Sequence, residues 1–314
     1  MEKFNSILFI KKLLDFSPRE GINETKAGVF LTSLLRKNNV KYYLQKFNVY
    51  IPKKIKTKLV INENEEIPVE PICFFSGVIE SVDNIISSFL PGEKNFSYIS
   101  FNPYCNSISI MNRSIKYPAI AIRRKDLFKV IKAKKTRVTI KIKKEIHQSQ
   151  NILVGNIYNP KNLIFAHYDS ISIGAVDNAS GVCIAMRLIL ENPNIINKSL
   201  FIFSGNEELS YDFPIYWGKG YREFEKKYFD LMKQAKKIYV VDCVGNGEPQ
   251  KLSTHYWIDE AFPIKNKKIA HKKTLIITGD IKKLWTYYHS DLDTINKLKK
   301  KYLDATYKLM LKVL

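Results

Sequence analysis

The sequence contains no apolar run that approaches the roughly 18–20 residues of a membrane-spanning helix. Its first 20 residues, MEKFNSILFIKKLLDFSPRE, place charges on both sides of a short apolar segment. That segment lacks the small-residue cleavage site of a signal peptide and has the spacing of an amphipathic helix. We therefore expect a cytoplasmic protein without a membrane partner.

Cysteine is scarce and widely spaced. The four cysteines are Cys73, Cys105, Cys183 and Cys243, and no two of them form a CxxC pair. This spacing argues against a thiolate zinc site and against a disulfide framework. Cys183 and Cys243 lie in apolar runs, so we expect them to be small core residues.

Arginine is also scarce, although the formal net charge is +21. Only eight of the 51 basic residues are arginine, the residue favoured for bidentate contacts with phosphate. The lysines are spread over nearly every segment. The densest basic stretch, KVIKAKKTRVTIKIKK (129–144), alternates apolar and polar residues in its second half, as a strand with a solvated face does. We expect no nucleic-acid partner.

The first half of the chain divides into two regions with different patterns of apolar residues. Residues 4–15 and 23–38 have helical spacing, and residues 40–50 alternate like a strand. From about 51 to 147 short β-like runs are separated by Pro, Gly and Asn, which predicts a small β-rich inserted domain. These runs are TKLVI, FFSGVIESV, SYISF, SISIM, YPAIAI and RVTIKIK.

From residue 151 onward the pattern alternates between strands and helices. Helices are expected at about 179–191, 220–236 and 293–314, and the expected strands are NILVGNIY, NLIFAH, SLFIFS, KIYVVDCV and KTLIIT. The alternation predicts an α/β fold with a central mixed, mostly parallel sheet and helices on both faces. Residues 1–50 and 148–314 would form this α/β domain, and residues 51–147 would form the inserted domain.

Polar residues follow the predicted strands at the point where each strand ends. In sheets of this kind, ligand sites collect at the carboxyl ends of the strands. The residues found there, in chain order, are His167, Asp169, Asp177, Glu207, Glu208, Asp242 and His289.

Taken singly, each of these residues is more simply explained as a helix cap or a surface group. Together they are harder to explain that way, because clustered carboxylates repel one another unless a cation is present. Two histidines and several carboxylates at one edge predict a divalent metal site, with mixed nitrogen and oxygen ligands that suit zinc. His147, His255 and His271 have no such pattern, and we expect no role for them in the site.

The spacing resembles the signature of the M28 family of di-zinc peptidases. The matching motifs are His-x-Asp (167–169), Gly-Ala-x-Asp-Asn-x-Ser-Gly (174–181), Glu-Glu (207–208), Asp242 and His-Ser-x-x-Asp-Thr (289–294). The resemblance covers about 151–314 and the opening helices with FSPRE. The related M20 family usually carries its extra domain between the fourth and fifth ligands, whereas the insertion here precedes the first.

The end of the insertion is also similar to another known module. The stretch YPAIAIRRKDLFKVIKAKKTRVTIKI resembles the end of a protease-associated domain, which many M28 members carry at this place.

The resemblance implies a role for each site residue. Two zinc ions, or other divalent ions such as cobalt or manganese, would be bridged by Asp177. His167 and Asp242 would complete one metal position, and Glu208 and His289 would complete the other.

The remaining roles concern catalysis and support. Glu207 would be the general base that takes a proton from the activated water, and Asp169 would hold the His167 ring. Tyr288 is a candidate to stabilise the oxyanion. Asp293 would either support the far side of the site or cap the last helix, and we favour the cap. The loop between Asp169 and Asp177 is short for the family, so family rules for side-chain preference need not transfer.

The function implied is that of a zinc-dependent aminopeptidase acting on peptides. A carboxypeptidase would need a converging arginine cluster, and Arg187 and Arg222 are isolated in the sequence. A glutaminyl cyclase is built on the same fold with one zinc, against which the full set of five ligands argues. A non-catalytic peptide-binding scaffold is a further alternative, although no ligand or base is missing.

Overall fold

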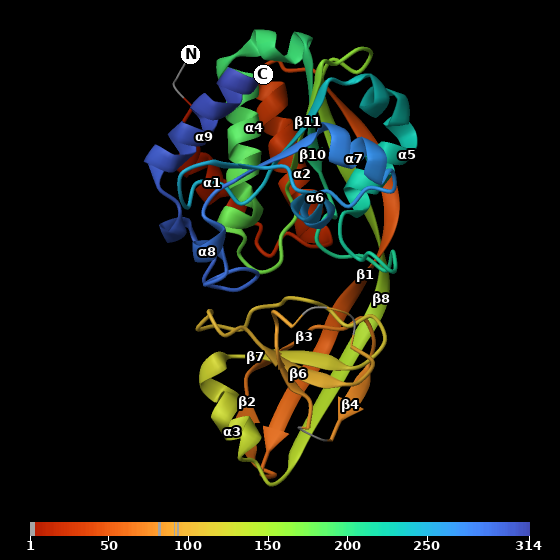
Figure 1. The fold of residues 1–314 in the computed structure, drawn as a ribbon, viewed down its shortest axis with the longest axis vertical. Helices are drawn as coiled ribbons and strands as arrows, with labels where there is room; N and C mark the ends of the chain where they lie inside the picture. Colours follow the sequence, from red (N-terminus) through yellow and green to blue (C-terminus); the bar gives the residue numbers. More distant parts are fainter. Residues whose placement is uncertain (1–3, 81–82, 91, 93) are drawn as a thin grey trace. The chain divides into compact units, whose positions relative to one another are not determined.

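The computed structural model describes residues 4–80, 83–90, 92 and 94–314. The chain divides into two compact units (Figure 1). Unit 1 comprises Met1–Val49, His147–Leu284 and Asp293–Leu314, and unit 2 comprises Tyr50–Ile146 and Trp285–Leu292. Two long strands, β1 and β8, each continue from one unit into the other, so NILVGNIY and RVTIKIK belong largely to one strand.

Unit 1 contains a mixed sheet in the order β12-β13-β11-β9-β10-β8-β1. The central strands β13, β11, β9 and β10 run parallel to one another, whereas β8 and β12 pair antiparallel with their neighbours. The strands are β1 (Tyr42–Ile61), β8 (Thr136–Gly155), β9 (Asn162–His167), β10 (Ser199–Ser204), β11 (Lys237–Val241), β12 (Gln250–Leu252) and β13 (Thr274–Thr278). The mixed α/β fold predicted from the alternation is confirmed.

Helices cover both faces of this sheet. Side chains of successive strand residues point to opposite faces, and every residue of β9 and β10 is buried, as expected for strands covered on both sides. The helices of unit 1 are α1 (Ser6–Leu14), α2 (Ile22–Lys37), η2 (Ala175–Ala179), α4 (Ser180–Glu191), η3 (Pro193–Asn197), α5 (Lys219–Gln234), α6 (His255–Ala261), α7 (Lys267–Lys273), α8 (Ile281–Leu284), η4 (Ile295–Lys297) and α9 (Lys300–Val313).

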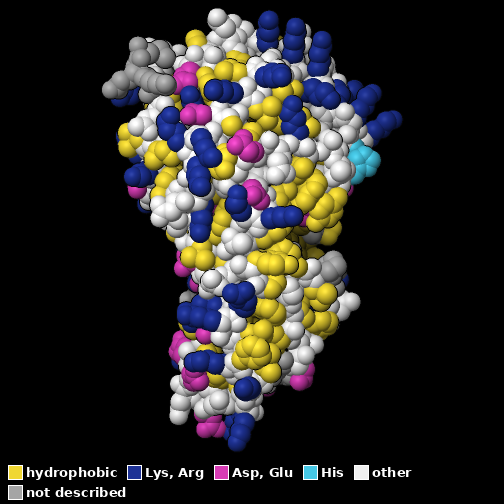
Figure 2. All heavy atoms as spheres, turned by 60° about the vertical axis from the view of Figure 1, so that its left-hand side comes forward, with side chains coloured by type: hydrophobic (Ala, Val, Ile, Leu, Met, Phe, Trp, Pro, Cys, Tyr) yellow, Lys and Arg dark blue, Asp and Glu magenta, His cyan; other side chains and the backbone are white. Residues whose placement is uncertain are grey.

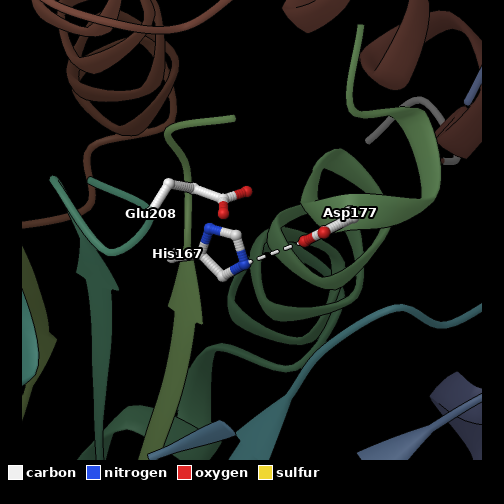
Figure 3. A group of neighbouring side chains, drawn as sticks. All are labelled: His167, Asp177 and Glu208. Carbon is white, nitrogen blue, oxygen red and sulfur yellow. Dashed lines mark ion pairs between the residues drawn. The ribbon is translucent and has the colours of Figure 1, made fainter. Parts of the chain in front are cut away.

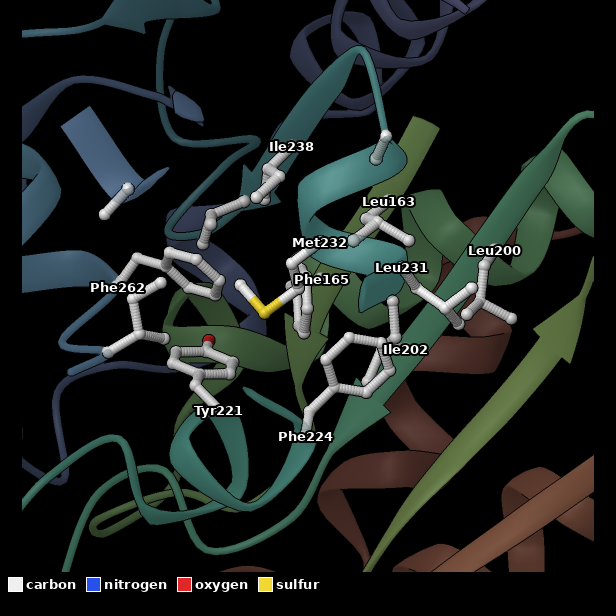
Figure 4. Packing of buried hydrophobic residues seen from close by; sticks show 14 of the residues in the cluster. Leu163, Phe165, Leu200, Ile202, Tyr221, Phe224, Leu231, Met232, Ile238 and Phe262 are labelled. Atoms are coloured by element: carbon white, nitrogen blue, oxygen red, sulfur yellow. The ribbon is translucent and has the colours of Figure 1, made fainter. Parts of the chain in front are cut away.

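The core on one face of the sheet is aromatic. Phe165 of β9 lies against Tyr221 and Phe224 of α5 and against Phe262, with ring centroids 4.9–5.5 Å apart (Figure 4). All four rings are buried. Rings at these separations add to the stability that burial of their area gives. This core makes β9 a rigid support for the residues that follow it.

The C-terminal helix is shorter than predicted. The sequence predicted a helix over 293–314, but the helical residues are η4 and then α9, with Leu298 extended between them. The Asp293 side chain accepts hydrogen bonds from the loop that carries Asp177, and the regular helix starts at Lys300.

Unit 2 has a core of its own, built mainly from isoleucine side chains. A four-stranded sheet has the order β3-β7-β6-β5, β2 pairs with β1, and β4 pairs with β8. The elements are β2 (Glu65–Ile67), β3 (Val69–Pro71), β4 (Gly77–Ile79), β5 (Ile85–Ser87), β6 (Tyr98–Phe101), β7 (Ala119–Ile122), η1 (Arg124–Asp126) and α3 (Leu127–Ile131).

Two of the β-like runs differ from the prediction. Residues 107–111 (SISIM) form no strand and instead contact the segment Trp285–Leu292. The run FFSGVIESV contains β4, and its residues 81 and 82 lie outside the described residues.

Among the described residues, no helix combines the length and the hydropathy that crossing a bilayer requires.

Candidate metal centre

The parallel strands bring several predicted ligands to one edge of the sheet. In the register of β9 with β10, His167 is opposite Ser204, so both strands end at the same level. Strand β11 runs parallel to β9 on its other side, and Asp242 directly follows it. The carboxyl ends of three neighbouring strands therefore carry His167, the Glu207–Glu208 pair and Asp242.

The side chains that follow these strands surround the His167 imidazole. His167 Nε2 lies 3.2 Å from Asp177 Oδ1 and 3.4 Å from Asp242 Oδ1. Ligand atoms of His167, Asp177 and Glu208 all lie within 4.8 Å of one another, and all three residues are buried. Figure 3 shows Glu208 and Asp177 on two sides of the ring.

The loop that carries Asp177 is fixed by its own motif. Asn178 donates through Nδ2 to the Val241 carbonyl at 2.9 Å, and its Oδ1 accepts from the Gly181 amide at 3.0 Å. A Cβ at Gly181 would lie 2.3 Å from the Val241 carbonyl oxygen, so only glycine allows this approach. The Asp-Asn-x-Ser-Gly run thus attaches Asp177 to the end of β11, next to Asp242.

Asp169 supports two of the predicted ligands at once. Its Oδ2 accepts a hydrogen bond from the Glu208 amide at 2.9 Å, and its Oδ1 lies 3.4 Å from His167 Nδ1. A carboxylate next to one ring nitrogen of a histidine orients the other nitrogen toward a metal. This contact supports the orienting role that the sequence predicted for Asp169.

The site is electrostatically unfavourable without a cation. Burial lowers the pKa of His167, but the carboxylates of Asp169, Asp177 and Asp242 outweigh this and raise the pKa well above its ordinary value. Burial raises the pKa of Glu207 well above its usual range; His167 lowers it, and the carboxylate of Glu208 raises it further. Both shifts have the cause expected when several carboxylates share a buried space.

The donor set fits a divalent metal ion. Asp242 Oδ1 is buried and has no hydrogen-bond partner among the described residues. It faces an imidazole nitrogen and a second carboxylate, the mixed nitrogen and oxygen ligation typical of zinc. A divalent ion would offset the repulsion between these carboxylates.

The role favoured for Asp293, a cap of the last helix, was wrong. Asp293 does not cap the last helix, because its Oδ1 accepts from the Val176 amide at 2.8 Å and its Oδ2 from the Asp177 amide at 3.0 Å. Burial raises the pKa of Asp293 to about 7, although these two amides oppose the shift. Asp293 therefore holds the loop that positions Asp177.

Sequence analysis missed Arg19, which is fully buried. Its guanidinium donates to the carbonyls of Tyr168, Ile173 and Gly174 at 2.6, 3.1 and 2.9 Å. Arg19 thereby encloses the short loop between His167 and Asp177. In the sequence, the one indication of a role for Arg19 was its position in FSPRE, a segment that the family resemblance covered.

Sequence analysis also missed a role for Cys243. The residue is buried as predicted, but its thiol lies within 4.8 Å of ligand atoms of Asp177 and Asp242. Burial raises the pKa of this thiol well above its usual range, and the two carboxylates raise it further. The Cys243 thiol therefore lies beside the predicted metal ligands Asp177 and Asp242.

The last two predicted site residues, Tyr288 and His289, belong to unit 2. The His289 ring stacks on the Tyr288 ring with centroids 3.7 Å apart, and His289 Nδ1 lies 2.9 Å from the Ile110 carbonyl oxygen. The structure therefore groups His167, Asp177 and Glu208 with Asp242 in unit 1, and holds His289 through unit 2.

The three other histidines lie elsewhere. His147 Nε2 lies 3.3 Å from the buried carboxylate of Glu24. His255 and His271 stack with centroids 3.9 Å apart, and His271 also contacts Asp259 at 2.9 Å.

Comparison with known proteins adds a family and a fold. Residues 152–275 match the model of Peptidase family M28. A search of the curated proteins gave no match.

Solved structures share the fold at low identity. A zinc aminopeptidase from Bacillus subtilis is 16% identical with a TM-score of 0.69, and the match covers 97% of this chain and 92% of that one. An aminopeptidase from Aneurinibacillus sp. strain AM-1 is 16% identical with a TM-score of 0.63, covering 96% and 90%. A glutaminyl cyclase from Bacteroides thetaiotaomicron is 14% identical with a TM-score of 0.54, covering 99% and 97%. Through the match at residues 152–275 and this shared fold, the chain is similar to peptidase family M28.

Proposed function

We propose that this protein is a zinc-dependent aminopeptidase that removes the first residue from peptides. The observation that carries the proposal is the buried group of His167, Asp177 and Glu208, whose ligand atoms lie within 4.8 Å of one another at the ends of parallel strands. The family match and the aminopeptidases among the solved structures support the same activity. A cytoplasmic location remains a prediction from the sequence.

The proposed ligands form two sets. Asp177 would contact both ions, His167 and Asp242 would hold one, and Glu208 and His289 would hold the other. Only three residues along the chain separate His289 from Asp293, whose carboxylate accepts hydrogen bonds from the Asp177 loop, so the chain tethers His289 to this loop. Bound divalent ions would supply Lewis-acid chemistry, which polarises a carbonyl group and acidifies water.

Glu207 is proposed to move the proton. Its carboxyl group is buried beside ligand Glu208, where it would take a proton from water and pass it to the leaving amine. Asp169 would orient His167 and the Glu208 backbone, and Tyr288 is proposed to donate to the oxyanion.

The arginines favour an aminopeptidase over a carboxypeptidase. Recognition of a terminal carboxylate calls for an arginine that is available to the substrate. Arg187 contacts Glu191 at 2.9 Å and Asp304 at 2.6 Å, and Arg222 contacts Asp212 at 3.0 Å and donates to a backbone carbonyl at 2.6 Å. Arg19 is committed to loop carbonyls in the same way.

Glutaminyl cyclisation is the second candidate, because two glutaminyl cyclases share the fold with TM-scores of 0.54. Incubation with three peptides separates the candidates: one with a free N-terminus, the same peptide acetylated, and one that begins with glutamine. Mass spectrometry then distinguishes loss of a whole residue from loss of ammonia.

The aminopeptidase proposal predicts zinc-dependent loss of the first residue from the free peptide only. Glu207→Gln should lower kcat by roughly 10²–10⁴-fold while the zinc content stays unchanged, because Glu207 is proposed to move a proton and not to bind metal. Loss of ammonia from the glutamine peptide without hydrolysis would support the cyclase. A zinc-loaded wild-type protein that changes none of the peptides would contradict both.

A further inference from the structure

The segment Trp285–Leu292 is held by the inserted domain, although the chain on both sides of it belongs to unit 1. Two hydrogen bonds join Ile110 to His289, one through the His289 backbone and one through its imidazole ring. The Ile110 amide donates to the His289 carbonyl at 3.0 Å, and His289 Nδ1 lies 2.9 Å from the Ile110 carbonyl oxygen. Both residues belong to unit 2, so this geometry is internal to that unit.

Two buried polar side chains of the insertion extend the contact along the segment. Ser109 Oγ donates to the Tyr288 carbonyl at 2.7 Å, and Asn102 Nδ2 donates to the Trp285 carbonyl at 3.0 Å. Asn102 also donates to Ser109 Oγ at 3.1 Å, which links the two contacts. Asn102 and Ser109 are 1% and 2% exposed, so losing either partner would leave buried carbonyls without a donor.

These contacts determine which ring nitrogen of His289 can bind a cation. A backbone carbonyl only accepts hydrogen bonds, so His289 Nδ1 must carry the proton. In the neutral ring the lone pair then resides on Nε2, and the ring cannot turn without breaking the bond to Ile110. A carbonyl that fixes the tautomer and orientation of a metal-binding histidine typically changes metal affinity by ~10–100-fold.

We propose that contacts within unit 2 set the metal-binding nitrogen of His289: Asn102 and Ser109 are positioning residues, and the Ile110 carbonyl presents His289 as an Nε2 ligand. This inference rests on the proposed function, because it assumes that His289 binds metal. It gives the insertion a role in metal binding, distinct from substrate selection. Removing these contacts should lower the affinity for the ion that His289 is proposed to bind. The affinity for the ion assigned to His167 and Asp242 should not change.

The test compares the full-length wild-type chain with Asn102→Ala/Ser109→Ala, and with Ser109→Ala alone should the double variant not fold. Ser114→Ala is the matched control, because Ser114 is a buried serine of unit 2 whose hydroxyl accepts from the Tyr117 amide. Metal-free proteins are titrated with cobalt, and the visible absorption spectrum reports ligand number and geometry. Hydrogen exchange of residues 285–292 reports whether the segment is held.

The proposal predicts two cobalt ions in the wild-type protein and in Ser114→Ala. In the variants one ion should bind roughly 10-fold or more weakly with an altered spectrum, and the amides of 285–292 should exchange faster. Variants that bind both ions with wild-type affinity and spectrum would overturn this inference alone, because the wild-type chain would still hold metal and hydrolyse peptides. A wild-type chain that binds no cobalt would overturn the proposed function as well.

Discussion

Asp293 shows at the residue scale how a polar group without a role in the chemistry can control the site. Its two carboxylate oxygens accept from two successive amides of the Asp177 loop, and no water is needed to satisfy either amide. The sequence placed Asp293 within a helix pattern and so predicted a cap. Hydrogen bonds between residues more than 100 positions apart leave no periodic signal, which is also why Arg19 was missed.

The predicted effect of Asp293→Asn follows from this pair of bonds. An amide side chain has a single acceptor oxygen, so one of the two buried amides loses its partner. We expect the free energy of unfolding to fall by about 1–3 kcal/mol, measured by urea denaturation of the metal-free protein. Asp291→Asn, at an exposed neighbouring carboxylate, is the control. Equal stability of the two variants would refute the role assigned to Asp293.

At the scale of elements, the predictions were most accurate for the buried strands. The expected strands NLIFAH and SLFIFS coincide with β9 and β10, because a short apolar run between polar residues has few alternatives. Helices α6 and α7 were not predicted, since each has only seven residues and too few turns for a periodic pattern. Residues 107–111 alternate like a strand, but they pair with the His289 segment outside either sheet.

The packing of α2 against β8 buries a carboxyl group, Glu24, that contacts His147 and Ser149 of that strand. Burial raises the pKa of Glu24 above its ordinary value of 4.5, although the contact with His147 opposes the shift. A raised folded-state pKa means that folding favours the protonated form. The stabilising contribution is thus complete below pH 4.5 and is lost as the pH rises through the folded-state pKa.

Glu24→Gln should remove this pH dependence, because glutamine is neutral throughout. The wild-type free energy of unfolding, minus that of the variant, should fall as the pH is raised from 4.5 toward neutrality. Urea denaturation of both proteins in the presence of a chelator measures this difference. Glu63→Gln, at an exposed carboxylate, is the control. A constant difference for Glu24→Gln would show that the buried carboxyl group does not titrate in this range.

For the whole molecule, the dominant feature is a net charge of +21. Lysine and arginine side chains occur over much of the face seen in Figure 2, and acidic ones are fewer. Such a field attracts anions over a range set by the Debye length, which is about 10 Å at 0.1 M salt. The composition predicted this property directly, because net charge does not depend on the fold.

The positive field should favour acidic substrates at low ionic strength. We expect kcat/KM for an acidic peptide to fall several-fold as salt is raised from about 0.02 to about 0.5 M, while that of a neutral peptide of equal length changes little. Initial rates at low substrate concentration measure both values. The same salt dependence for the two peptides would show that the charge does not steer substrates to the site.

The most direct test of the account is the amount of zinc bound per chain after loading and removal of excess metal, measured for the wild-type protein and for Asp177→Asn. Because Asp177 is proposed to contact both ions, the account predicts two zinc ions in the wild-type protein and loss of both in the variant at limiting zinc. A wild-type protein that retains no zinc, or a variant that retains as much as the wild type, would contradict the proposal that these strand ends form a metal centre.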